Sequence, residues 1–225
     1  MESANGHSQR ARVFLHPIAA PSILGLFGFA GSTFMVTAHL AGWYGDAATQ
    51  QYLAPFAAAF GGLAQFAAGM WAYRARDGLA TAMHGMWGSF WIGYGILFLL
   101  IANGTLSLEA ASVPLGFWFI ALTWITLMGA IAASGESLAL AGVLHTLWIG
   151  SGLLAIGLLT GVGGWEIAGA YVLMLSAILA WYTASALMFE DVLGRPVLPV
   201  GLTSKAKEAP ELAVGAGEPG VKHGQ

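Results

Sequence analysis

The sequence predicts an all-α membrane protein with six transmembrane helices, and three observations carry that prediction. Hydrophobic residues make up 57% of the 225 residues and charged residues only 8%, whereas a soluble domain carries roughly 25% charged residues. The chain contains six apolar segments of the length that crosses a bilayer, about 20 residues. All eight Lys and Arg residues fall on one side of a six-span arrangement. We therefore expect a multi-pass integral membrane protein of the cell membrane, surrounded by lipid.

The six predicted spans are joined by short connections and occupy residues 21–41, 53–73, 84–102, 114–133, 138–160 and 167–189. Pro21, Pro55 and Pro114 fall near predicted helix starts, where a missing N–H costs little. The resulting domain plan is an N-terminal segment 1–20, a transmembrane domain 21–192 and a C-terminal tail 193–225. From about residue 205 the tail is rich in Ala, Gly, Pro, Glu and Lys, so we expect disorder there.

The distribution of charge predicts the orientation of the chain. Two Arg precede the first span, Arg74 and Arg76 separate the second and third spans, and four Lys or Arg follow the sixth. Positive loops stay in the cytoplasm, so both termini are expected there. Asp46, Glu109 and Glu166 fall in the three loops of the opposite side.

Several classes of function are excluded or disfavoured by what the sequence lacks. There are no cysteines, so disulfides, thiolate metal sites and cysteine nucleophiles are ruled out. No basic patch could follow a nucleic-acid backbone, and no hydrolase or phosphate-loop motif indicates an enzyme. We expect no cofactor and no metal site. The spans offer hydroxyls, amides, histidines and aromatics, which suit a small, weakly polar or neutralised solute.

Polar and small residues form stripes on three of the spans. They are Ser22, Gly25, Phe29, Ser32 and Thr33 in the first, Gly61, Gln65 and Gly69 in the second, and His84, Trp87, Trp91 and Tyr94 in the third. An amide facing lipid without a partner is costly, so the second stripe should face protein or a water path. Each stripe can either line a path or pack helices together.

Three histidines, His39, His84 and His145, lie in or beside different spans. Histidine can shuttle protons or sense pH, and it can also hold haem. Two haem ligands should face each other at similar depth, whereas His39 is near the outer end of its span and His84 near the inner end. These depths argue against a haem pair, although His145 leaves that alternative open.

Four blocks, in order along the chain, resemble the acetate uptake transporter family, also called the succinate-acetate permease family. They are APSILGLFGFAGSTF at 20–34, FGGLAQFAAGMWAYR at 60–74, WGSFW at 87–91 and LGRPVLPVG at 193–201. The chain departs from the family pattern at Ala20, Ile23, Ala72 and Trp87, where Asn, Pro, Glu and Tyr are usual. These departures indicate a divergent member.

The resemblance implies transport of acetate, succinate or other short carboxylates, by a proton-coupled or channel-like mechanism. It implies a homo-hexamer with one pore in each protomer and a constriction of Phe29, Trp87 and Leu127. The residues expected to bind substrate or line the pore are Pro21, Ser22, Gly25, Ser32, Thr33, Gln65, Ser89 and Trp91, and His39 and His84 are expected to have a proton or pH role. The alternatives are a channel for another small solute such as ammonia or urea, a haem-binding redox membrane protein, and a membrane protein without transport activity.

Overall fold

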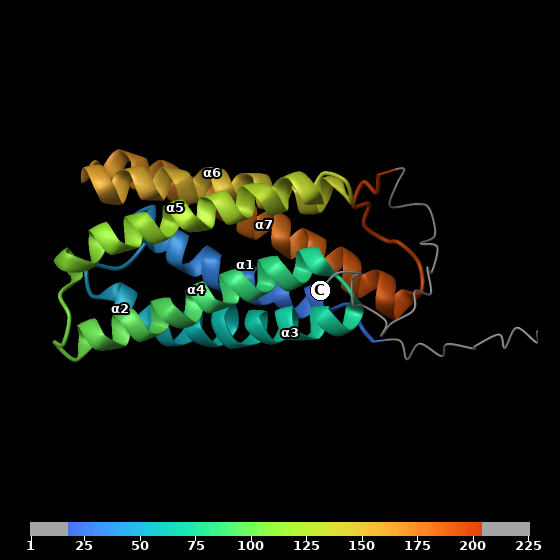
Figure 1. Cartoon of the computed structure of the whole chain (residues 1–225), viewed down its shortest axis with the longest axis horizontal. Coiled ribbons are helices and arrows are strands. Elements are labelled where there is room, and N and C mark those ends of the chain that lie inside the picture. The colour runs from blue at the N-terminus through green and yellow to red at the C-terminus, as the bar shows by residue number, and fades with distance from the viewer. Residues whose placement is uncertain (1–17, 204–225) are drawn as a thin grey trace, which may run out of the picture.

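The computed structural model describes residues 18–203, and every long element among them is a helix (Figure 1). The elements are α1 Pro21–Leu40, α2 Thr49–Ala57, η1 Ala58–Ala64, α3 Gln65–Ala75, α4 Gly78–Ala102, α5 Leu108–Ala133, α6 Leu138–Thr160 and α7 Gly163–Leu193. Six continuous helical segments of the described residues are long and apolar enough to cross a membrane. Most of the N-terminal segment, and the tail from about 205 in which disorder was expected, lie outside the described residues.

Polar residues cap three of the helices, and two of these, α4 and α5, begin earlier than the predicted spans. Asp77, Ser107 and Ser137 each accept a hydrogen bond from a backbone N–H in the first turn of α4, α5 and α6. Such caps satisfy N–H groups that would otherwise have no partner at a helix start. As a result α4 and α5 begin six residues before the predicted spans at 84 and 114.

Pro55 and Pro114 do not stand at helix starts, and this expectation was wrong. Both lie inside helices, Pro55 in α2 and Pro114 in α5. Hydropathy marks where the apolar stretch begins, whereas α5 extends back to its cap at Ser107 and α2 extends back to Thr49 without a side-chain cap. Only Pro21 occupies the first turn of its helix, α1.

The second span is one helical rod built from α2, η1 and α3, and η1 is a seven-residue π-helical segment. The backbone N–H of Gly61, within η1, donates to Ser32 Oγ of α1 at 2.7 Å. Ser32 is fully buried, and its hydroxyl lies 3.5 Å from the carbonyl oxygen of Ala57. Ser32 therefore ties the wider helical turn to α1.

The stripe of Gly61, Gln65 and Gly69 faces protein, as the cost of an amide in lipid predicts. Gln65 is 3% exposed. A Cβ on Gly69 would lie 2.7 Å from the backbone nitrogen of Gly85, so α3 and α4 are in backbone contact there. A Cβ on Gly61 would overlap the ring of Trp91. The small residues thus allow close packing around a buried amide.

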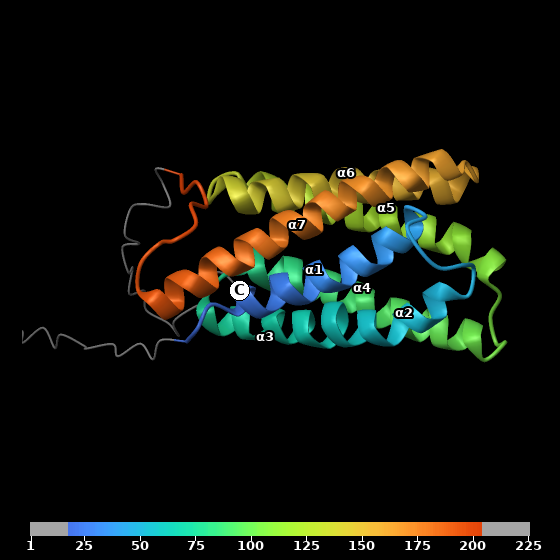
Figure 2. The same cartoon turned by 180° about the vertical axis from the view of Figure 1, so that it is seen from behind.

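The helices run roughly along one long axis and form two groups that face each other (Figures 1 and 2). One group pairs α6 with both α5 and α7, and the other pairs α3 with α4. α1 lies between them and packs on α7 and on the second span. We call one end of the bundle the termini end. It carries residue 18, the α3–α4 and α5–α6 connections and the segment after α7.

The segment after α7 folds across the termini end and binds the α5–α6 loop. The N–H groups of Leu138 and Ala139 donate to the carbonyls of Gly201 and Val200, each at 3.0 Å. The N–H of Thr203 donates to the carbonyl of Glu136 at 3.0 Å. This strap of residues 199–203 therefore holds the loop that carries Glu136.

Candidate functional site

Two pockets lie end to end inside the helical bundle and share Trp87 and Leu147. The wide pocket, away from the termini end, has a volume of about 330 Å³ and is lined by α1, α2, α4, α5, α6 and α7. The narrow pocket, toward the termini end, has a volume of about 40 Å³ and is lined mainly by α1, α4 and α6. Together they mark a path along the bundle that is interrupted where they meet.

The partition between the pockets consists of Phe29 of α1, Trp87 of α4 and Leu147 of α6, each 2–3% exposed. The rings of Phe29 and Trp87 meet edge to face with centroids 6.2 Å apart. The indole N–H of Trp87 donates to Thr126 Oγ1 of α5 at 2.9 Å. Since Phe29 and Leu147 have no polar side-chain atoms, the partition presents a hydrocarbon surface to the path.

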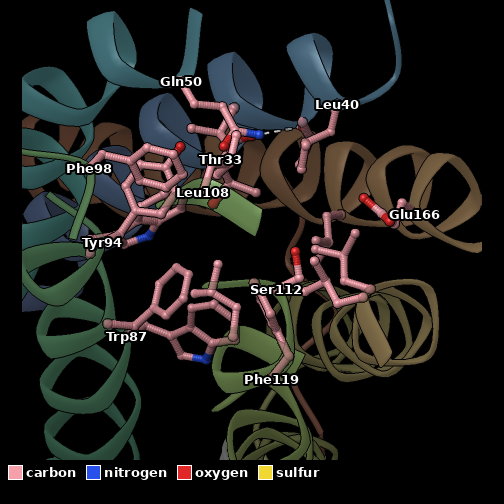
Figure 3. A pocket seen from close by; sticks show the side chains of 18 of the residues that line it. Thr33, Leu40, Gln50, Trp87, Tyr94, Phe98, Leu108, Ser112, Phe119 and Glu166 are labelled. Atoms are coloured by element: carbon pink, nitrogen blue, oxygen red, sulfur yellow. Dashed lines mark hydrogen bonds between the residues drawn. The ribbon is translucent and has the colours of Figure 1, made fainter. Parts of the chain in front are cut away.

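The wide pocket contains buried polar atoms without hydrogen-bond partners. They are Thr33 Oγ1, Trp91 Nε1 and Tyr94 OH, on residues that are 3–6% exposed. Figure 3 shows Trp87, Tyr94 and Phe119 as the aromatic side of this pocket, with Thr33 and Ser112 also lining it. Buried polar groups without partners are rare in folded proteins, so these three can bond a polar solute or water.

The narrow pocket has a polar cluster next to the start of α1. His84 Nε2 lies 3.2 Å from Ser22 Oγ, while His84 Nδ1 and Gln65 Oε1 are buried without partners. Gly25 leaves room for the imidazole, because a Cβ there would overlap the ring. The first turn of α1 has no side-chain cap. A helix start of this kind favours negative charge.

Carboxylates stand at both ends of the path. Asp77 and Glu136 line the narrow pocket, and Glu166 of α7 lines the wide one. Partial desolvation, and then the nearby carboxylate of Asp77, raise the pKa of Glu136 above its usual value. Among the described residues no Lys or Arg lines either pocket. A passing anion would therefore meet N–H and O–H donors but no cationic partner.

The structure brings some of the expected constriction together and leaves one member outside. Phe29 and Trp87 meet, as expected from the resemblance. Leu127 of α5 is partly buried and lines neither pocket. Leu147 stands where the third side chain was expected. No signal in the sequence separates these two leucines, because each lies in a run of apolar residues.

The other predicted pore residues divide between the pockets and the packing around them. Ser22, Gln65 and His84 line the narrow pocket, and Thr33 and Trp91 line the wide one. Pro21 begins α1, Gly25 packs on His84 and Ser32 bonds the second span. The hydroxyl of Ser89 donates to the Gly85 carbonyl of its own helix at 2.8 Å and lines neither pocket.

The other two predicted histidines, His39 and His145, lie away from the path. His39 lies in the last turn of α1, where its Nδ1 is 3.1 Å from the carbonyl oxygen of Tyr44, and it lines neither pocket. Both ring nitrogens of His145 have partners, since Trp148 Nε1 donates to Nδ1 at 3.1 Å and Ser134 Oγ lies 3.2 Å from Nε2. That arrangement leaves His145 no free nitrogen for iron, and the haem alternative has no support here.

Besides Leu147, three residues that line the pockets or bond a residue that lines them were not singled out from the sequence. Thr126 is a single hydroxyl among apolar neighbours, and its partner lies 39 residues away in the chain. Tyr94 was recognised only as part of an aromatic stripe. Glu136 was counted as a loop residue, since only the fold shows that it borders a pocket.

The chain is similar to a known protein family, to several named proteins and to a solved structure. The family model described as the GPR1/FUN34/yaaH family matches residues 4–194. The succinate-acetate/proton symporter SatP of Escherichia coli K12 is 26% identical over 187 residues, which are 82% of this chain and 96% of that protein. Ammonia transport outward protein 2 of Saccharomyces cerevisiae is 26% identical over 176 residues, 76% of this chain and 62% of that protein. A solved structure of the bacterial acetate channel SatP superposes with a TM-score of 0.73 at 25% identity, covering 82% of this chain and all of that one.

Proposed function

We propose that this chain, which belongs to the GPR1/FUN34/yaaH family, transports acetate and other short carboxylates such as succinate across the cell membrane. The observation that carries the proposal is the pair of pockets that share Trp87 and Leu147, with Phe29 packed against Trp87 on the narrow side. The likeness to the succinate-acetate symporter and to the acetate channel supports the same substrate class. The chain is a multi-pass membrane transporter and not an enzyme.

The proposed mechanism follows from the donors on either side of the partition. A carboxylate entering the wide pocket is held by the unpaired hydroxyl, indole and phenol groups there. Burying an ion without a charged partner is very costly, and protonation removes most of that cost. The acid therefore crosses the hydrocarbon partition in its neutral form. On the other side Ser22, His84 and the start of α1 receive the carboxyl group, which loses its proton toward the mouth at Asp77 and Glu136.

Orientation and assembly are part of the proposal. Arg74, Arg76 and Arg195 lie at the termini end, whereas Asp46, Glu109 and Glu166 lie at the opposite end. On the positive-inside rule, we propose that both termini lie in the cytoplasm. The path runs within one chain, so a homo-hexamer would contain one pore in each protomer. The mass of the purified particle in detergent would test the hexamer.

Uptake of radiolabelled acetate into proteoliposomes with an acidic exterior tests the function. We expect saturable uptake that is competed by short carboxylates and that increases as the external pH falls. Leu147→Ala should widen the partition and raise the uptake of butyrate relative to acetate. Leu127→Ala is the matched control, because that leucine lines neither pocket, and it should keep the wild-type ratio. Wild-type uptake equal to that of empty liposomes would remove acetate as the substrate.

A further inference from the structure

The hydrogen bond between Trp87 and Thr126 carries an inference about selectivity that rests on the proposed function. Thr126 is 0% exposed and lies on α5, which packs only lightly on α4. Its Oγ1 accepts the indole N–H of Trp87 at 2.9 Å, and the bond is buried at both ends. Trp87 is also held by the edge-to-face contacts with Phe29 and Phe90. The two ring contacts pack the indole, and the hydrogen bond to Thr126 sets the direction in which its N–H points.

The polarity of the partition depends on this one bond. The indole N–H is the only polar side-chain group among Phe29, Trp87 and Leu147. If the indole turned away from Thr126, its N–H would face the narrowest point, offer a hydrogen bond to a passing carboxylate ion and lower the cost of its desolvation. With the N–H bonded to Thr126, the partition has no donor to offer. Unpaired polar atoms remain on both sides, but none remains at the partition itself.

We propose that Thr126 is a selectivity-determining positioning residue, which occupies the indole N–H of Trp87 so that the partition passes the neutral acid and rejects the carboxylate ion. The side chain of Thr126 itself does not line either pocket. It acts on the transported species only through the tryptophan. The transporter is thereby limited to the protonated form of its substrate.

The experiment compares acetate influx into proteoliposomes at several values of pH, together with influx driven by an imposed membrane potential. Above the pKa of acetic acid the neutral form decreases about tenfold for each pH unit. Wild-type influx should decrease at least that steeply and should not respond to the potential. Thr126→Val removes the acceptor and lets the indole turn its N–H toward the path, so the slope should become shallower and a potential-driven acetate influx should appear. Thr126→Ser keeps the acceptor and should behave as the wild type.

Two further variants separate the hydrogen bond from packing. Thr123→Val is the matched control on the same helix, because the hydroxyl of Thr123 bonds its own backbone at Phe119, and it should keep the wild-type slope. The double variant Thr126→Val with Trp87→Phe has no N–H at the partition. It should regain the wild-type slope, although its absolute rate will differ. A loosened bundle would instead leave the double variant as permeable to the ion as Thr126→Val alone.

Each outcome bears on a defined claim. A wild type without uptake above empty liposomes refutes the proposed function. A wild type that transports acetate with a shallow pH slope, or a folded Thr126→Val with the wild-type pH slope, refutes the role of Thr126 and leaves the proposed function intact. If Thr126→Val cannot be purified, Thr126→Ala, which also lacks the acceptor, takes its place with the same expectation, and a wild-type slope in that folded variant would overturn the inference.

Discussion

Replacing Ser32 by Ala should destabilise the bundle by breaking the link between α1 and the π-helical segment. The Ser32 hydroxyl accepts the N–H of Gly61 at 2.7 Å in a fully buried position. Alanine has no acceptor, so the N–H is left without a partner. Leaving a buried donor unpaired costs about 1–3 kcal/mol. Taking about 2 kcal/mol, the melting temperature of a chain of this size should fall by roughly 4–8 °C.

The assay is thermal unfolding of the purified protein in detergent, followed by the loss of the monodisperse peak on gel filtration. Ser151→Ala is the matched control, because Ser151 is equally buried but its hydroxyl donates to the Leu147 carbonyl of its own helix at 2.7 Å. Such bonds add little to helix stability, so the control should change the melting temperature by less than about 2 °C. Equal shifts in the two variants, or no shift for Ser32→Ala, would refute the reasoning.

Two other substitutions test the mouth of the path and the closest helix contact. The pKa of Glu136 is raised by partial desolvation and by Asp77, so its carboxyl keeps a proton to higher pH than an ordinary glutamate, and the mouth gains negative charge as the pH rises through that pKa. Glu136→Gln should therefore flatten part of the decrease of acetate uptake with pH, whereas Glu109→Gln at the opposite end should not. Identical pH profiles for Glu136→Gln and the wild type would count against a role for this charge. Gly69→Ala would place a Cβ 2.7 Å from the backbone of α4. The overpacking should destabilise the folded protein by about 1–3 kcal/mol and lower its melting temperature. Gly78→Ala is the control, because a Cβ there would have nothing within 4 Å, and its melting temperature should equal that of the wild type.

Much of the architecture could be predicted because hydropathy and charge report directly on the bilayer. The six spans and their order follow from apolar segments of sufficient length. The boundaries could not be predicted as well, since helices continue to polar caps such as Asp77 that hydropathy scores as loop. The π-helical turn at Ala58–Ala64 leaves no mark in composition, because it depends on a partner, Ser32, from another helix.

Site residues could be predicted where they stand in a recognisable sequence block. They could not be predicted where membership of the site depends on which face of a helix turns inward. Phe29 and Trp87 stand in blocks with a recognisable pattern, and they meet in the fold. The choice between Leu127 and Leu147 depends on which face of α5 or α6 turns inward. Helices that are apolar on all sides give no such signal. The pairing of Trp87 with Thr126 is a long-range contact that only the fold brings together.

The strap of residues 199–203 links the carboxyl-terminal region to the mouth of the path. Its backbone bonds to the α5–α6 loop fix the segment that carries Glu136. A truncation placed directly after α7 would remove those bonds and release the loop, whereas one placed after Thr203 would leave them intact. Affinity tags and fluorescent fusions should therefore be attached beyond Thr203, because a junction nearer the last helix would alter the entrance as well as the tail.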